Sequence, residues 1–366
     1  MDGDRYSGLR LTVVGPLPPP SGGMANQCKQ LLGLLEGEGA QVELVRTNAP
    51  YSPAFVGRVP VLRAFARLVP YLLALWRASG RSDVMHVLAN SGWSWHLFSA
   101  PAIWIARLRG TPVIVNYRGG EAEPFFAAAP RFVHRTLGSA SGLVVPSAFL
   151  EGVFRRFGFE SRIVPNIINL QRFAVPRSMS GARRAPHVVV TRNLEPIYDI
   201  PTVLSAFALV LKRIPEATLT VAGSGPELQN LENMARTLGI AGAVTFAGRI
   251  DNEKIPALYA SADLMLNPST VDNMPISILE AFASGVPVVS TDVGGVPFIA
   301  EHGRTALLVP ARAPERMAEA MLELLLDEGK AQRLSAAASE EVKQYAWPVI
   351  REKWLSAYRS AMLAKD

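Results

Sequence analysis

The stretch of residues 267–296, NPSTVDNMPISILEAFASGVPVVSTDVGGV, constrains the fold of this chain more strongly than any other part of it. It predicts a loop, a helix opened by Pro275 and ended by Gly285, a buried strand at 287–290 and then a Gly-rich turn. A short apolar strand joined to a helix in this way is typical of α/β domains with parallel sheets. The rest of the chain is therefore expected to supply further strands and helices of the same kind.

Two carboxylates lie in this stretch, Asp272 in the loop and Glu280 about a turn and a half into the helix. Pro275 leaves the next amides, those of Ile276 and Ser277, without partners inside the helix, and such a helix start attracts anions. The two acids would suit the hydroxyls of a sugar whose phosphate lies on the helix end. The alternative is ordinary helix chemistry, in which Asp272 is a cap and Glu280 compensates the helix dipole.

Length and composition place the chain among globular proteins of more than one domain. Its 366 residues exceed what a single core usually fills. Hydrophobic residues make up 49% of the chain and charged residues 19%, so sizeable cores can form. The formal net charge of +6 is not gathered into long runs, which favours phosphate-bearing ligands or an anionic membrane surface as partners over nucleic acid.

Nothing in the sequence predicts secretion or a membrane span. Cys28 is the one cysteine, which suits a reducing cytoplasm, and the polar N-terminus leads straight into a strand without a signal segment. The most apolar candidate for a span, residues 87–108, contains His96, Arg107 and several other polar residues, so a core strand and a core helix are expected there. We therefore expect a cytoplasmic protein.

The pattern along the chain predicts two domains of alternating strands and helices. The first, residues 1–178, is expected to hold strands at 9–15, 41–45, 83–88, 112–117, 142–146 and 162–165. Residues 176–186 are the expected linker. The second domain, residues 187–345, begins with buried strands at 187–191 and 217–223, and residues 346–366 form the tail.

A Gly-rich turn follows the first strand, and a basic helix follows the second. Gly22 and Gly23 would let the backbone approach a phosphate closely, although a tight turn explains two glycines as well. Residues 61–81 have apolar residues at helical spacing, interleaved arginines and no acid, with Pro70 as an interruption. A helix of this kind can lie on an anionic membrane, and the alternative is a core-facing helix with a solvated basic edge.

Residues 274–309, MPISILEAFASGVPVVSTDVGGVPFIAEHGRTALLV, resemble the signature of the retaining glycosyltransferases of family 4. In that family two acids are separated by seven residues, and the second lies on a helix that leads into a Gly-Val-Pro-Val-Val strand. Asp272 and Glu280 fit this spacing, although the family's first acid is usually Glu, which reaches further. The resemblance covers nearly the whole chain and implies the α/β fold called GT-B, with two Rossmann-like domains whose parallel sheets face a cleft and a C-terminal helix, residues 346–366, that packs back on the first domain.

The resemblance assigns the second domain to a nucleotide-sugar donor. In the family an Arg after this domain's first strand binds the donor diphosphate, and Arg192 matches it. The family's Lys five or six residues later is replaced by Ile197 or Tyr198, and a phenol supplies a hydrogen bond but no cation. Gly223 follows a strand at the edge where such sheets bind ligands, and Arg249 would lie near the base. The implied donor-binding residues are Gly22, Gly23, Arg192, Gly223, Arg249, Asp272, Asn273, Met274, Pro275, Ile276, Ser277 and Glu280.

The first domain would bind the acceptor. Where family members commonly carry His, this chain has Arg118, followed by Gly119. Arg118 could clamp a phosphate or an acidic sugar but is a poor proton acceptor, and Glu121 or Glu123 could face the acceptor instead. The alternative is that these are solvated loop charges. The candidate catalytic residues are Asp272, Glu280, Arg192 and Arg118, and the acceptor side is assigned to Arg118, Gly119 and Glu121.

Several other chemistries are excluded by the sequence. The five histidines are scattered without ligand spacing, and the one Asp-x-Asp, formed by Asp2 and Asp4, lies at the terminus, so no metal cofactor is expected. Neither a Gly-x-Ser-x-Gly elbow nor a reactive-cysteine context points to a hydrolase. Cationic stabilisation would therefore come from Arg side chains and helix ends.

The sequence thus predicts a transferase that moves a hexose-type sugar, with retention, from a nucleotide diphosphate donor to a glycan or lipid-linked acceptor in polysaccharide biosynthesis. No residue is an evident nucleophile on the donor's other face, so front-face attack is expected, with the leaving phosphate taking the acceptor's proton. Two alternatives stay open. One is a non-catalytic relative that binds a sugar nucleotide or a partner enzyme, which Arg118 and the missing Lys motivate, and the other is a sugar-nucleotide epimerase of the same fold.

Overall fold

The computed structural model describes residues 6–19, 22–50, 60–129, 131–175 and 185–364, without the side chains of residues 60–65. The chain packs into two compact units: unit 1 comprises Met1–Ile167 and Trp347–Asp366, and unit 2 comprises Ile168–Ala346. Unit 1 thus ends ahead of the boundary predicted at residue 178 and takes up the chain again at the tail. Asp2, Asp4 and residues 176–184 of the predicted linker lie outside the described residues.

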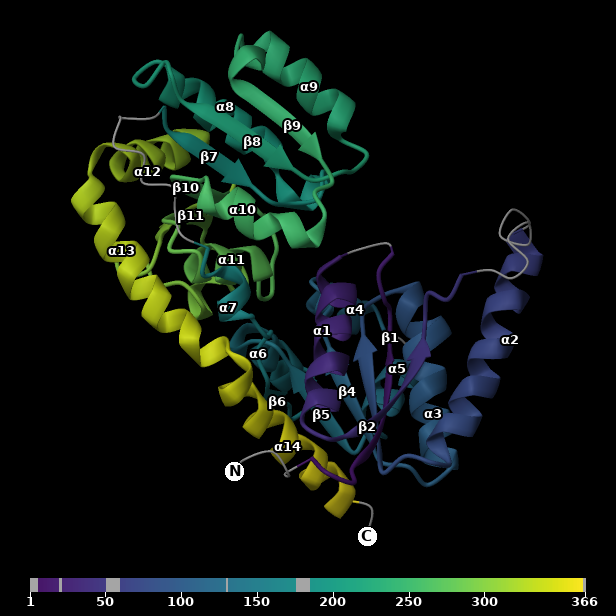
Figure 1. Ribbon diagram of the computed structural model, residues 1–366. Coiled ribbons are helices and arrows are strands. Elements are labelled where there is room, and N and C mark those ends of the chain that lie inside the picture. Colours follow the sequence, from purple (N-terminus) through teal and green to yellow (C-terminus); the bar gives the residue numbers. More distant parts are fainter. Residues whose placement is uncertain (1–5, 20–21, 51–59, 130, 176–184, 365–366) are drawn as a thin grey trace. The chain divides into compact units, whose positions relative to one another are not determined.

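Unit 1 is built on a parallel six-stranded sheet with the strand order β2-β1-β3-β4-β5-β6 (Figure 1). Its strands are β1 (Arg10–Gly15), β2 (Gln41–Arg46), β3 (Val84–Ala89), β4 (Val113–Tyr117), β5 (Gly142–Val145) and β6 (Arg162–Ile163). Successive side chains of a strand point to opposite faces, so Val13 joins the core on one side and Val14 the core on the other. Because both faces are covered, β3 is buried along its whole length.

Helices α2 to α6 cover one face of this sheet, and α1 and α14 cover the other. Their bounds are α1 (Gly23–Gly37), α2 (Pro60–Ser79), α3 (Ala100–Leu108), α4 (Ala122–Ala128), α5 (Arg131–Leu137), α6 (Ala148–Arg156) and α14 (Trp347–Leu363). The strand and helix expected within residues 87–108 are β3 and α3. Over the ranges that the structure describes, no helix combines the length and apolar character that crossing a bilayer requires.

Helix α2 continues through Pro70, so the predicted interruption at that residue is wrong. A proline inside a helix removes one backbone donor and strains the preceding turn. Here packing outweighs that cost, because Tyr71, Leu75 and Ala78 on the inner face are buried. The Tyr71 hydroxyl also donates a 2.7 Å hydrogen bond to the carbonyl oxygen of Phe98. The buried inner face that holds the helix in place thus begins directly after the proline.

A buried histidine holds α14 against the sheet of unit 1. His86 on β3 is fully buried, with the Asn116 amide nitrogen 3.0 Å from its Nε2 and the Tyr358 hydroxyl 2.8 Å from its Nδ1. When the amide donates to Nε2, the neutral ring carries its proton on Nδ1 and donates it to Tyr358. The ring of Trp354 packs on the same imidazole, with centroids 4.5 Å apart. Burial lowers the pKa of His86 to about 3, assisted by the charge of Arg118.

Unit 2 has a second parallel sheet, with the order β12-β11-β10-β7-β8-β9. Its strands are β7 (His187–Val190), β8 (Thr218–Ala222), β9 (Val244–Gly248), β10 (Leu264–Asn267), β11 (Val288–Thr291) and β12 (Leu307–Val309). Read from β9, this is the order of a doubly wound Rossmann-like sheet. Val188 and Val189 enter different cores, so this sheet is also covered on both faces. The prediction of two Rossmann-like α/β domains is confirmed.

The helices of unit 2 divide between its two cores. One core contains side chains of α8, α9 and α12, the other those of α7, α10 and α11, and α13 contributes to both. Their bounds are α7 (Leu170–Phe173), α8 (Ile200–Leu211), α9 (Leu228–Thr237), α10 (Ile255–Ala260), α11 (Ile276–Ala283), α12 (Pro314–Leu326) and α13 (Glu328–Glu341). Met317, Met321 and Leu324 of α12 are buried.

We expect the histidine under α14 to make unit 1 sensitive to acid. His86 has a pKa of about 3 in the folded protein and 6.5 as the reference value, so between these pH values the unfolded chain binds a proton that the folded chain does not. Its contribution to the free energy of unfolding should fall by about 1.4 kcal/mol per pH unit as the pH drops from 6.5.

Urea unfolding of wild type and His86→Gln between pH 4 and pH 8 measures this effect, because Gln keeps hydrogen-bonding groups but does not titrate. The variant should be less stable at pH 8, and the gap between the two proteins should narrow as the pH falls. Parallel curves for the two proteins would contradict the assignment.

Candidate functional site

The candidate site of unit 2 lies where the order of its strands reverses. From β7 the chain proceeds outward to β8 and β9, and from β10 it proceeds in the other direction to β11 and β12. In open α/β sheets the ligand binds at this point, beyond the carboxyl ends of the two central strands. β7 and β10 are hydrogen-bonded neighbours, and Arg192 follows the first while Asp272 follows the second.

Arg192 and Asp272 form an ion pair, with 2.5 Å between Nη2 and Oδ2. Their side chains are only 12% and 13% exposed. Nη2 and Nε of Arg192 also donate to the amide oxygen of Asn267, at 2.5 and 2.8 Å. The ring centroid of Tyr198 lies 5.2 Å from the Arg192 Cζ, within the range of a cation–π interaction. The fold therefore brings together two predicted site residues that lie far apart in the sequence.

Asn267, the last residue of β10, is fully buried and bound at both ends of its amide. Its nitrogen donates to the Ser290 hydroxyl at 2.9 Å, and its oxygen accepts from the Ser269 hydroxyl at 3.2 Å. The Thr291 hydroxyl in turn donates to the carbonyl oxygen of Ser269 at 2.6 Å. These hydrogen bonds fix the amide with its oxygen toward Arg192.

Two glycine turns hold the loops that carry Arg192 and Asp272. A Cβ atom on Gly223 would lie 1.8 Å from the Arg192 carbonyl oxygen, and one on Gly295 would lie 1.6 Å from the Asn273 carbonyl oxygen. The Gly295 amide donates to the carbonyl oxygen of Asp272 at 2.8 Å. Only glycine permits backbones to approach so closely. Gly223, which the sequence assigned to donor binding, thus packs directly against the loop of Arg192.

Helix α11 begins directly after Pro275, which caps it in an extended conformation. The Ile278 amide donates to the Pro275 carbonyl oxygen at 3.2 Å, whereas the amides of Ile276 and Ser277 precede the first intrahelical bonds. A helix start of this kind suits an anion, as the sequence predicted for these two residues. The Ser277 side chain is 5% exposed, and within the described ranges its hydroxyl has no hydrogen-bond partner. A buried hydroxyl is unfavourable without a partner, so Ser277 can serve an anion bound at this helix end. Asn273 and Met274, just before the helix, are buried.

Glu280 lies about a turn and a half into α11 and is partly buried. The Tyr259 hydroxyl of α10 lies 3.3 Å from its Oε2 and 2.6 Å from the Thr191 hydroxyl. Burial raises the pKa of the Glu280 carboxyl to about 7, and the charge of Arg172 opposes this rise. Desolvation disfavours the charged carboxylate and here outweighs the nearby cation. Near neutral pH, Glu280 therefore exists in both protonation states.

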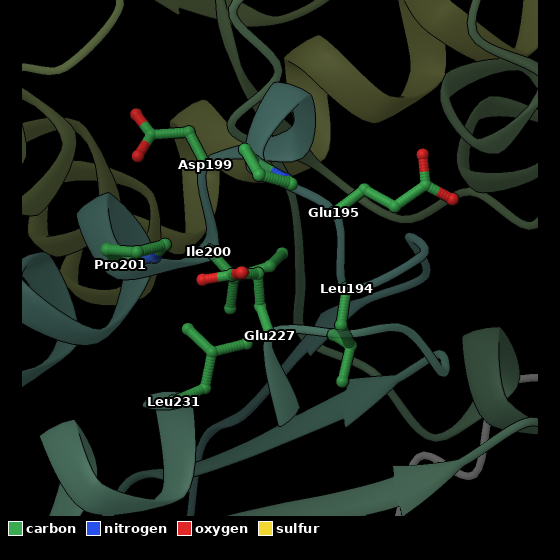
Figure 2. A pocket seen from close by; sticks show the side chains of 8 residues that line it. Leu194, Glu195, Asp199, Ile200, Pro201, Glu227 and Leu231 are labelled. Carbon is green, nitrogen blue, oxygen red and sulfur yellow. The ribbon is translucent and has the colours of Figure 1, made fainter. Parts of the chain in front are cut away.

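A small acidic pocket lies beside the Arg192 loop (Figure 2). Its volume is about 150 Å³, and its lining consists of Leu194, Glu195, Pro196, Asp199, Ile200, Pro201, Glu227 and Leu231. Figure 2 shows the carboxylates of Glu195 and Asp199 pointing in opposite directions. Ligand pockets usually measure about 300–1,000 Å³, so this one is too small for a nucleotide. Over the described ranges, no three His, Cys, Asp or Glu residues form a cluster suited to a metal ion.

The predicted acceptor-side residues lie in unit 1, after β4. Arg118 is partly buried, and its Nη1 donates to the amide oxygen of Asn166. Burial lowers the pKa of this guanidinium to about 10, so it stays charged at neutral pH. Glu121 is exposed at the start of α4, and Glu123 forms an ion pair with Arg156 at 2.8 Å. The role of these residues toward an acceptor stays a prediction.

The remaining predicted residues fall at turns. Gly119 packs tightly, because a Cβ there would lie 2.6 Å from side-chain oxygens of Asn90 and Ser91. Gly22 directly precedes α1 and Gly23 is the first residue of that helix. In unit 2, exposed Arg249 follows β9. Donor binding by these residues also stays a prediction.

Sequence reasoning missed several residues of this site. Asn267 ends the apolar strand LMLN, and a polar side chain at that buried position was a signal for a specific partner. Tyr259 and Arg172, which act on the Glu280 carboxyl, carried no comparable signal. Tyr198 was noted only as a residue that cannot supply a cation, whereas its ring lies against Arg192.

Two family models match consecutive parts of the chain. The one described as Glycosyl transferase 4-like domain matches residues 7–166, which lie in unit 1. The one described as Glycosyl transferases group 1 matches residues 181–341, which lie in unit 2 and include Arg192, Asp272 and Glu280.

Comparisons with characterised proteins and solved structures agree with these models. The chain is 28% identical over 374 residues to a GDP-mannose-dependent α-(1-6)-phosphatidylinositol monomannoside mannosyltransferase of Mycobacterium tuberculosis, with 94% of this chain and 96% of the relative covered. A sucrose-phosphate synthase of Thermosynechococcus elongatus has a similar structure, with a TM-score of 0.73, 21% identity, and 96% and 98% of the two chains covered. Anabaena HepE in complex with UDP gives a TM-score of 0.74 with 16% identity, and 96% and 100% covered.

We predict that the Glu280 carboxyl titrates near pH 7. Arg172→Gln should raise this pKa further, because the variant removes the largest influence that stabilises the ionised form. Side-chain carboxyl NMR titration of protein labelled at glutamate measures the value directly. Arg213→Gln, which removes the same charge from an exposed position on unit 2, is the matched control and should leave the titration unchanged. A midpoint near 4.5 in the wild type would contradict the burial argument.

Proposed function

Since the chain belongs to the glycosyltransferases that join a glycosyl transferase 4-like domain to a group 1 domain, we propose that it transfers a hexose from a nucleotide diphosphate sugar to a lipid-linked or glycan acceptor. The observation that carries this proposal is the meeting of Arg192, Asp272 and the start of α11 at the switch point of the second sheet. A cation and a helix start together suit a diphosphate. An acid beside them suits sugar hydroxyls.

The proposed chemistry is transfer with retention from the front face of the sugar. The bond between the anomeric carbon and the phosphate oxygen breaks, and the nucleoside diphosphate leaves with the electron pair. The acceptor hydroxyl bonds to the same face of that carbon, and its proton passes to the leaving phosphate. Arg192 and the α11 amides would stabilise the developing charge, and the absence of one such donor costs about a hundredfold in rate. We propose that no metal ion is needed.

The acids take separate roles in this proposal. Asp272, already bound to Arg192 through Oδ2, would hold the donor sugar. Glu280 would accept hydrogen bonds from ribose hydroxyls, which requires its ionised form. Because its pKa lies near 7 before binding, nucleotide binding would release a proton below that pH.

The family assignment supports an enzyme over the alternative of a non-catalytic relative. That alternative was motivated by Arg118 and by the missing Lys, whose place Ile197 or Tyr198 takes. The ring of Tyr198 lies against Arg192 and so belongs to the same site. The mycobacterial relative is named for a phosphatidylinositol mannoside substrate, and we extend a lipid-linked acceptor to this chain as a proposal. A role in polysaccharide biosynthesis belongs to the same proposal.

We further propose that unit 1 associates with an anionic membrane through α2. Val69, Leu72, Leu73 and Trp76 of this helix are 49%, 37%, 51% and 44% exposed. Their spacing of three, four and seven residues places them on one outer face, distinct from the buried inner face.

The charges around this outer face match an anionic surface. Helix α2 contains no acid, and exposed Arg77 follows Trp76. The Arg109 guanidinium lies 4.8 Å from the Trp76 ring centroid. Apolar side chains bordered by arginines suit the headgroup region of anionic lipids. Nucleotide sugars are cytoplasmic metabolites, so we place this association on the inner face of the membrane.

A thermal-shift panel tests which class of nucleotide the protein binds as its donor. Purified protein is heated with UDP, GDP, ADP and their sugars, with and without EDTA. At about a hundred times its dissociation constant a ligand stabilises by about 2.7 kcal/mol, so one nucleotide class should raise the Tm and the rise should survive EDTA.

Arg192→Ala and Glu280→Gln should each fold but lose most of that shift and of donor turnover, whereas exposed Arg213→Ala should keep both. No shift with any nucleotide would refute the donor proposal. A shift that EDTA removes would refute the metal-free chemistry.

Vesicle flotation tests the proposed association of α2 with an anionic membrane. We expect the wild type to float with vesicles containing phosphatidylglycerol at low salt, and less with pure phosphatidylcholine. Val69→Glu with Leu73→Glu places two charges on the outer face of α2 and should abolish flotation. The matched control, Phe298→Glu with Leu326→Glu, alters two exposed apolar residues of unit 2 that are 55% and 62% exposed, and should float like wild type. If the wild-type protein stays in the dense fraction with the anionic vesicles, α2 is not a membrane-binding surface.

A further inference from the structure

The guanidinium of Arg192 is held along one edge by hydrogen bonds. A guanidinium has five N–H donors in one plane, one on Nε and two on each terminal nitrogen. Nε donates to Asn267, and Nη2 donates to both Asn267 and Asp272. These three bonds use every N–H group on that edge. Within the described ranges no acceptor is recorded for the two N–H groups of Nη1.

An aromatic ring covers the guanidinium as well. The Tyr198 ring centroid lies 5.2 Å from the Arg192 Cζ. The backbone around Tyr198 is itself fastened to the acidic loop, because the amide and the hydroxyl of Thr270 both donate to the carbonyl oxygen of Ile197, at 2.9 and 3.0 Å. Hydrogen bonds thus join the backbone next to Tyr198 to the loop that carries Asp272, and the Tyr198 ring lies over the guanidinium.

We infer that Asn267 and Tyr198 are positioning residues for Arg192: together they set the guanidinium plane so that its two Nη1 N–H groups are presented to the diphosphate of the donor. The inference rests on the proposed function, since it assigns a geometry to the same site. Neither residue needs to touch the ligand. Each acts by reducing the number of orientations in which Arg192 can bind.

The chemical identity of the two side chains supports this assignment. Asn267 offers a neutral oxygen, so it orients the cation without cancelling its charge. Asp272 already supplies one negative charge to Arg192, and a second buried carboxylate would compete with the phosphates. Tyr198 adds attraction through its ring face, which also leaves the positive charge in place.

The test measures binding of UDP, GDP and ADP to the full chain by isothermal titration calorimetry. Tyr198→Phe keeps the ring and should hold the dissociation constant within about threefold of wild type, whereas Tyr198→Leu removes the ring and should weaken binding about three- to tenfold. Asn267→Asp keeps the shape of the side chain and adds the competing charge, so it should weaken binding more than tenfold.

A double-mutant cycle separates positioning from a general structural effect. In the Arg192→Ala background, Tyr198→Leu and Tyr198→Phe should bind the nucleotides equally weakly, because no guanidinium remains to be oriented. Should Asn267→Asp fail to fold, the Tyr198 pair and its cycle still decide the question. Equal affinities for the Leu and Phe variants, or a difference that persists without Arg192, would overturn the inference.

The outcomes also distinguish this inference from the proposed function. If the wild type binds a nucleotide and the Tyr198 variants are equivalent, only the positioning role is wrong. If the folded wild type binds none of UDP, GDP and ADP, the donor site itself is refuted and the positioning role with it.

Discussion

The carboxyl ends of β7 and β10 bring an arginine and an aspartate into contact, and the loops of the second domain are arranged around that contact. Glycine turns after β8 and β11 lie against the backbones of the two loops, at distances that no side chain would allow. The buried amide oxygen of Asn267 then accepts two hydrogen bonds from the guanidinium of Arg192 and fixes its orientation. A charge held this rigidly in a partly desolvated place interacts with a ligand more strongly than the same charge in water, and it needs no reorganisation on binding.

Desolvation acts on several ionisable groups of this protein, with opposite results for acids and bases. It raises the pKa of Glu280 and lowers those of His86 and Arg118, because burial disfavours whichever form is charged. For His86 the neutral form is useful, since the ring then joins β3, β4 and α14 by hydrogen bonds. For Glu280 a pKa near neutrality suits the role proposed for it, in which the carboxyl ionises as ribose hydroxyls bind. The same physical effect thus stabilises the architecture of one domain and, under the proposed function, prepares binding in the other.

Much of the fold follows from local patterns. The apolar strands and the Gly-rich turns and helices between them predicted the parallel sheets of both domains. Pro70 is the exception. A proline inside a helix is locally unfavourable. The inner face of α2 packs against residues that are distant in the sequence, and this packing outweighs the cost of the proline. The spacing of apolar residues in α2 also did not predict which of them face the core and which are exposed.

By itself, the sequence determined the class of fold, the two-domain organisation and the segment that carries the paired acids, because these depend on the order and spacing of residues along the chain. Only the tertiary structure decided that Asp272 pairs with Arg192, that Asn267 and Tyr198 hold the arginine, and that burial brings the Glu280 pKa near neutrality. Contacts between residues of neighbouring strands depend on how the sheet is ordered, and desolvation depends on everything packed around a group. Neither quantity is a property of a local stretch of chain.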